Sequence, residues 1–183
     1  MTRPARAWFP AALVVCLAAV VANAQTATVN AQTPPVRQPS TDSATARGTA
    51  MTIAKGPFDV KTTPQGNMTD PAAVGRLSLD KTFHGDLEGT SAGEMLAVRT
   101  AVQGSAGYVA IERVTGTLAG RTGTFALQHW GMMDKGAPDL KISVIPDSGT
   151  GDLTGLAGTM TIDIQPGGKH FYAFTYTLPP AAK

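Results

Sequence analysis

The sequence predicts an all-β protein, a single eight-stranded antiparallel meander β-barrel, and three observations support this. Apolar and polar residues alternate at every second position over much of residues 51–180, which is the period of a strand with one buried face. Glycine-rich segments separate these runs at short intervals. No window of this region has a helical period. Meandering strands with short connections can close into a barrel, which removes both sheet edges.

Residues 1–24 have the pattern of an export signal. Two arginines precede an apolar run over residues 7–22, and Ala22 and Ala24 are the small residues expected before a cleavage site. The run of 16 residues is shorter than the roughly 20 needed to span a bilayer. We therefore expect cleavage after Ala24, export to the periplasm or the medium, and no stable membrane insertion of the mature chain.

Charge and cysteine content exclude several classes of function. The chain has 15 Lys and Arg against 13 Asp and Glu, and loss of Arg3 and Arg6 with the signal leaves 13 of each. A nucleic-acid partner is not expected, because attraction to phosphate depends on an excess of cations. The lone cysteine, Cys16, lies inside the signal. The mature chain then has no thiol for disulfides, thiolate catalysis or metal ligation.

Residues 25–50 are interpreted as a disordered linker between the signal and the barrel domain at residues 51–180. The segment has no aromatic residue and is rich in Thr, Ala, Gln, Ser and Pro. Such a composition cannot bury enough apolar surface to offset the entropy of ordering the chain.

The strands of the barrel are predicted from the alternating runs. In the last run, Tyr172, Phe174 and Tyr176 alternate with smaller residues. A barrel of eight strands is either filled by its own side chains or holds one small ligand. The expected strands lie near residues 55–62, 75–84, 87–99, 106–117, 123–131, 139–146, 158–165 and 169–178.

A short motif, G-x-L-x-G, occurs at residues 85–89, 116–120 and 151–155. Glycine accepts positive φ at tight corners, and the leucine of each motif can plug a barrel end. We interpret the motifs as hairpin corners, and the alternative that their glycines let a ligand approach the backbone stays open. A dinucleotide site is rejected because no helix or βαβ unit follows.

The segments around these motifs resemble one bacterial family. Residues 83–89, 116–129 and 146–158, in this order, look like the domain of unknown function 3224. The resemblance covers nearly the whole folded part and implies the eight-stranded antiparallel barrel of allene oxide cyclase and plant dirigent proteins. It implies no activity, because the family has none established and a shared fold does not transfer function. Asp147 stands where the family usually has glycine.

Polar residues on otherwise apolar strand faces form the candidate ligand-binding site. Lys81 and His129 each lie an even number of residues from apolar residues of the same strand, so they share the face that those residues occupy. Adjacent strand residues face opposite sides, so either Glu112 or Arg113 must point inward. Burying Lys81 unpaired would be costly, so Glu112 is its natural partner. One interpretation is a purely structural ion pair near a barrel mouth. The functional alternative makes Lys81, Glu112, Gln128 and His129 the polar end of an apolar pocket.

Three histidines, His84, His129 and His170, raise the question of a zinc site. A tri-histidine site needs all three rings to converge on one ion. His84 has the opposite parity to the apolar residues of its strand, and no H-x-H or H-E-x-x-H spacing occurs. We therefore predict no metal and no cofactor. A Ser148-based triad is not supported either, because this serine lies in a glycine turn without a nucleophile elbow.

The sequence thus favours an exported, non-catalytic binding module for a small, largely apolar molecule. Two alternatives remain open at this stage. One is an isomerase-like or cyclase-like enzyme in which His129 and Glu112 transfer protons in the same pocket. The other is a filled structural barrel with no ligand. No catalytic residue is assigned, and the sequence does not define an oligomeric state.

Overall fold

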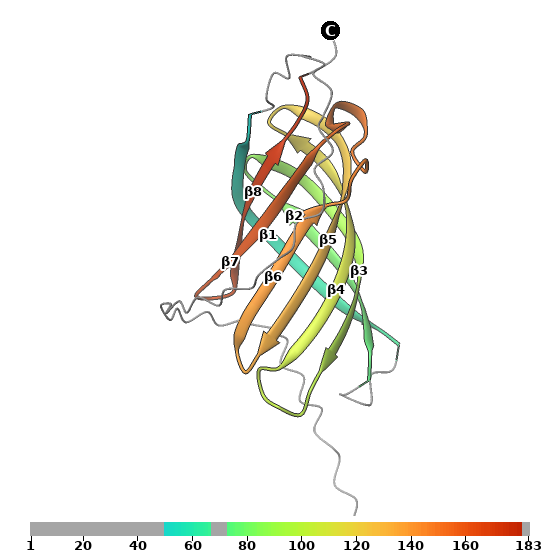
Figure 1. Ribbon diagram of the computed structural model, residues 1–183, viewed down its shortest axis with the longest axis vertical. Helices are drawn as coiled ribbons and strands as arrows, with labels where there is room; N and C mark the ends of the chain where they lie inside the picture. The colour runs from blue at the N-terminus through green and yellow to red at the C-terminus, as the bar shows by residue number, and fades with distance from the viewer. Residues whose placement is uncertain (1–49, 67–72, 181–183) are drawn as a thin grey trace, which may run out of the picture.

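The computed structural model describes residues 50–66 and 73–180, which form one closed barrel of eight antiparallel strands. Each strand pairs with the next along the chain, and β1 pairs with β8 to close the ring (Figure 1). The elements are β1 (Thr52–Gln65), β2 (Gly75–Phe83), β3 (Leu87–Arg99), β4 (Ala106–Leu118), β5 (Arg121–Asp134), β6 (Ala137–Val144), the 3-10 turn η1 (Gly151–Leu153), β7 (Ala157–Gln165) and β8 (Lys169–Thr177).

These elements confirm the predicted all-β meander barrel. The eight expected runs coincide with the eight strands, and the main difference is that β1 and β5 extend further at both ends. Backbone pairing continues into the tight hairpins, where Leu118 pairs with Arg121 and Asp134 with Ala137. Side-chain alternation does not mark where these strands end, because Arg121, Asp134 and Ala137 are not buried, although Leu118 is.

Two parts of the predicted organisation lie outside the described residues. These are the export signal at residues 1–24 and all but the last residue of the linker predicted at residues 25–50. In the described part of the chain, no helix is long and apolar enough to cross a membrane.

One end of the barrel is filled with apolar side chains. We call it the closed end; β1, β3, β5 and β7 begin there. The three motif leucines, Leu87, Leu118 and Leu153, are fully buried and belong to the larger apolar cluster. Phe125 and Phe174 stack beside them with ring centroids 5.8 Å apart. The motif leucines therefore plug this end, as the sequence predicts.

Strands β6 and β7 separate toward the other end, which we call the open end. Between β6 and β7, register pairs are present only at Ile142 with Met160 and Ser143 with Thr159. By contrast, the ladder between β5 and β6 runs along all of β6. Figure 1 shows β6 and β7 splaying apart as they approach the lower end of the view. The seam between them is thus closed near one end and open near the other.

The sequence gives two reasons for the open seam. If the ladder continued from Ile142 and Met160, Asp139 would lie directly opposite Asp163. Like charges directly opposite one another destabilise a strand pair. Pro138 follows in the same stretch and has no N–H to donate. Both features oppose pairing over the last residues of the seam.

Candidate functional site

Four polar side chains meet inside the barrel, and we call them the buried polar cluster: Lys81, Ser91, Glu112 and His129. Lys81 Nζ donates to Glu112 Oε1 at 2.7 Å, and Ser91 Oγ donates to Glu112 Oε2 at 2.7 Å. His129 Nε2 lies 2.8 Å from Glu112 Oε1. Both carboxylate oxygens of Glu112 are therefore occupied by neighbours on three other strands.

The strand register explains why these residues meet. Lys81 pairs with Ser91 across β2 and β3, so their side chains leave the sheet on the same inner face. Glu112 on β4 and His129 on β5 have the same inward parity as buried apolar neighbours on their strands. Of the two residues that compete for the interior in β4, Glu112 is buried and Arg113 is exposed. The expected pairing of Lys81 with Glu112 is confirmed.

Burial and charge act in opposite directions on this cluster. Burial alone would raise the pKa of Glu112, but the hydrogen bond with His129 and the charge of Lys81 outweigh it and lower the pKa to about 2. Burial lowers the pKa of Lys81, although the charge of Glu112 acts to raise it. Glu112 is thus held as a carboxylate at neutral pH.

The ammonium of Lys81 also faces aromatic rings of the core. Its Nζ lies 5.5 Å from the ring centroid of Phe58 and 5.8 Å from that of Phe83. A cation over an aromatic face is attracted by the ring quadrupole, most strongly where water is excluded. This contact ties the buried polar cluster to the apolar packing of the closed end.

Gln128 does not join the cluster. It is exposed on the outer face of β5, directly beside the buried His129. Neighbouring strand residues point to opposite faces, so His129 and Gln128 cannot both point inward. The expectation that Gln128 belongs to the interior group is therefore wrong.

A small hollow lies beyond the cluster, at the open end between β6 and β7. Its volume is about 170 Å³. Apolar side chains form most of its wall, and two carboxylates stand at its edge. The lining residues are Ala106, Tyr108, Gly131, Met132, Met133, Pro138, Asp139, Leu140, Ile162, Asp163 and Ile164.

Tyr108 separates the hollow from the buried polar cluster. Its ring packs over Gly131, where an added Cβ would overlap Tyr108 Cε1, so a side chain there would force the ring to move. On its other side the ring packs against the small apolar cluster of Leu79, Met95 and Ala110. Burial, helped by the charge of Glu112, raises the pKa of Tyr108 to about 12. The phenol therefore remains a neutral hydroxyl at physiological pH.

Sequence analysis missed two residues of this region. Ser91 shares the inward parity of Leu87 and Met95 on β3, and this parity could have identified it as a partner for Glu112. Tyr108 has the same parity as Ala110 and Glu112 on β4. Neither residue stands out in the sequence, because a serine or a tyrosine on a strand is common.

The three histidines lie in different environments. His84 is about half exposed on the surface near Asp59 and Glu88, whereas His129 is buried in the polar cluster. His170 packs against Phe58 with ring centroids 5.2 Å apart. Among residues 50–66 and 73–180, no group of three or more His, Cys, Asp and Glu side chains is arranged to hold a metal ion.

A second, wider depression lies on the outside of the barrel. Most of its lining consists of outward-facing residues of β1 to β4, including Asp59, Lys61, Asp80 and Arg113, and it also includes the buried Lys81 and Ser91. Its side chains carry both signs of charge and it lacks an enclosed apolar wall. The hollow at the open end is the better candidate for a small-molecule site, because such sites are concave and mostly apolar.

Comparison with known proteins identifies the family. The model of the DUF3224 family, described as a protein of unknown function, matches residues 54–176. The chain belongs to the DUF3224 family. A crystal structure of a DUF3224 protein with unknown function from Shewanella oneidensis MR-1 is 52% identical, with a TM-score of 0.67. That similarity covers 72% of this chain and 100% of the Shewanella chain. No curated protein matches the chain.

Proposed function

We propose that this DUF3224 protein is a non-catalytic binding module for one small, largely apolar molecule, held in the hollow at the open end. The observation that carries the proposal is the apolar hollow itself, which lies where the β6–β7 ladder stops. Small-molecule sites combine an apolar wall with a few polar groups that fix orientation. Here the wall is supplied by residues such as Leu140, Ile162 and Ile164, and the polar groups by Tyr108 and the rim carboxylates.

The volume limits the size of the ligand. An apolar protein cavity of about 150 Å³ binds benzene in another protein. A hollow of about 170 Å³ therefore suits a single ring or a short branched chain. The apolar wall also favours such a body over a strongly hydrated one, because its burial releases water from both surfaces.

The buried polar cluster fits a supporting role better than a catalytic one. Glu112 already accepts hydrogen bonds on both oxygens, and Lys81, Glu112 and His129 are absent from the lining of the hollow. The hydrogen bond between His129 and Glu112 is the observation that favours the second candidate, a proton-transferring isomerase or cyclase. That function would require Tyr108 to move so that substrate reaches His129. Turnover of a bound compound would favour the enzyme.

Benzyl alcohol tests the binding proposal, because its ring fits the hollow and it carries no charge. In an amide NMR titration, saturable shifts should gather at Gly131, Ile162 and their neighbours. Ile164→Trp should fill the hollow and abolish the titration. Ile111→Trp is the matched control, because Ile111 is 57% exposed on the outer face of β4. No saturable shift in the unmodified protein, or equal loss in both variants, would contradict the proposal.

We further propose that the protein is exported and processed after Ala24. Support comes from the arginines, the apolar run and the small residues of the N-terminal segment. The intact mass of the protein isolated from its host should correspond to a chain that begins at Gln25. A mass that includes residues 1–24 would contradict export by this route.

A further inference from the structure

The rim of the hollow carries two acidic side chains that the binding proposal does not yet use. Asp139 on β6 and Asp163 on β7 both line the hollow, and both are exposed. Extension of the register from Ile142 and Met160 places the two carboxylates on facing positions across the open seam. Because Leu140 and Ile162 have the inward parity of their strands, Asp139 and Asp163 stand on the outer side of the two lips of the opening.

Neither carboxylate has an ion-pair partner in the described part of the chain. Within residues 50–66 and 73–180, neither Asp139 nor Asp163 forms an ion pair, and Asp163 Oδ2 accepts only a 3.3 Å hydrogen bond from Gln165. Lys141, the closest lysine along β6, lies with its Nζ 4.9 Å from the ring centroid of Trp130 on β5.

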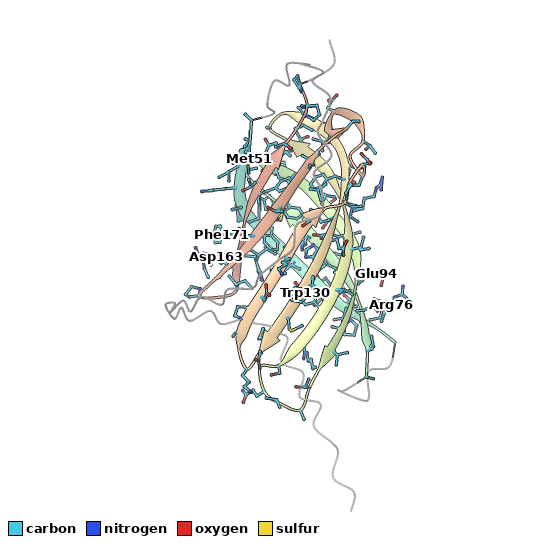
Figure 2. The ribbon with its side chains drawn as sticks, viewed as in Figure 1. Met51, Arg76, Glu94, Trp130, Asp163 and Phe171 are labelled. Atoms are coloured by element: carbon cyan, nitrogen blue, oxygen red, sulfur yellow. The ribbon has the colours of Figure 1, made fainter. Side chains whose placement is uncertain are left out.

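Other cations are either engaged or absent from the wall. Figure 2 shows Arg76 beside Glu94 on the opposite side of the view from Asp163, and the Arg76 and Glu94 side chains form an ion pair at 2.7 Å. Among the described residues that line the hollow, none is a lysine or an arginine. The described lining of the hollow therefore carries two carboxylates and no cation, and two lysines of this end, Lys135 and Lys169, lie in the hairpins outside it.

We propose that the ligand is an amphiphilic amine, whose apolar body enters the hollow and whose ammonium lies between Asp139 and Asp163. This inference rests on the proposed binding function and names the ligand class for the same site. An ammonium has three donors and one positive charge, so it can serve both carboxylates at once. An anion of the same size meets two like charges at the entrance and no cation in the described lining of the hollow.

The same contact would act on the seam. Repulsion between facing carboxylates opposes pairing of β6 with β7, and a bound ammonium removes that repulsion. Leu140 and Ile162 are the next facing pair toward the paired end of the seam if the register continues. Movement of β6 toward β7 would therefore bring these two side chains over the apolar body of the ligand. Amine binding should therefore protect the amides of residues 139–141 and 161–163 from hydrogen exchange.

Three ring compounds of similar size test the proposal: benzylamine, benzyl alcohol and benzoate, each titrated at pH 7 and low salt with NMR detection. Benzylamine should bind about fivefold to tenfold more tightly than benzyl alcohol, as expected for two solvent-exposed charge contacts. Benzoate should bind more weakly than either. The advantage of benzylamine should shrink as salt is added, because exposed charges are screened.

Charge-removing variants locate the effect. Asp139→Asn and Asp163→Asn should each reduce the preference for benzylamine, and the double variant should abolish it while benzyl alcohol still binds. Asp152→Asn is the matched control, since Asp152 is exposed in η1 at the closed end and the substitution changes net charge equally. It should leave the preference intact.

Each outcome separates the two proposals. If none of the three compounds binds, the proposed function itself fails. If benzyl alcohol binds at the hollow but benzylamine is no tighter, the amine inference is overturned and the binding function stands. Persistence of the amine preference in the double Asn variant, or its loss in Asp152→Asn, would also overturn the inference, because the rim carboxylates would not be its source.

Discussion

The closed and open ends of this barrel are built from the same alternating strands, yet they have different interiors. At the closed end, Leu153 is fully buried among the other motif leucines. At the open end, Leu140 has an inward position but remains 36% exposed, beside the hollow. The difference follows from the seam: where β6 and β7 pair, apolar side chains are covered, and where they part, similar side chains face a cavity.

The buried polar cluster lies between the two ends, and its removal should have the largest effect on stability. Glu112→Ala should lower the free energy of unfolding by about 3–5 kcal/mol, because it leaves the buried Lys81 without its partner. Denaturant-induced unfolding measures this. The double variant Lys81→Met, Glu112→Leu should recover much of the loss, since it removes both charges. Equal destabilisation in the single and double variants would contradict an uncompensated charge as the cause.

A pair of leucine truncations compares the two ends directly. Leu153→Ala should cost about 2–5 kcal/mol, because a fully buried side chain leaves a cavity in a packed cluster. Leu140→Ala should cost less than about 1 kcal/mol, because this side chain is partly solvated and already borders a hollow. Chemical denaturation of both variants gives the two values. Similar costs would show that the open end is as tightly packed as the closed end.

Acid should destabilise the buried polar cluster that lies between the two ends. The pKa of Glu112 is lowered from 4.5 to about 2 in the folded protein, so its contribution to stability is complete above about pH 4.5 and is lost as the pH falls toward 2. Unfolding free energies from pH 7 to pH 2 should show this decline. Glu112→Gln should flatten it, whereas Asp152→Asn should not. A decline of the same size in Glu112→Gln would assign the acid sensitivity to other carboxylates.

A smaller effect tests the corners of the closed end. Gly155 has φ of +78°, and a Cβ added there would lie 2.8 Å from Pro179 Cγ. Gly155→Val should therefore cost about 1–3 kcal/mol. Thr154→Val, its control, should cost about 1 kcal/mol, since it loses only the hydrogen bond to the Gly151 carbonyl oxygen. Equal melting temperatures for the two variants would mean that the glycine conformation is not required.

Much of the candidate site could be predicted from parity and from the need to pair a buried charge. Lys81 and His129 follow the two-residue period of apolar neighbours, whereas parity left Glu112 and Arg113 open and the need of Lys81 for a partner favoured Glu112. The structure brings Lys81, Glu112 and His129 together. Gln128 fails the same test, because it is adjacent to His129. The backbone explains why the family usually has glycine at position 147. Asp147 has φ of 59°, a conformation that favours glycine.

The sequence by itself determined the strands, their inward residues and the leucine corners, because these depend on side-chain alternation and local backbone conformation along one segment. Only the tertiary structure decided that Ser91 completes the contacts of Glu112 and that Tyr108 separates the polar cluster from the hollow. It also decided where the β6–β7 ladder ends and which residues line the resulting opening. These features depend on register between strands far apart in the chain, and no period within a single strand records that register.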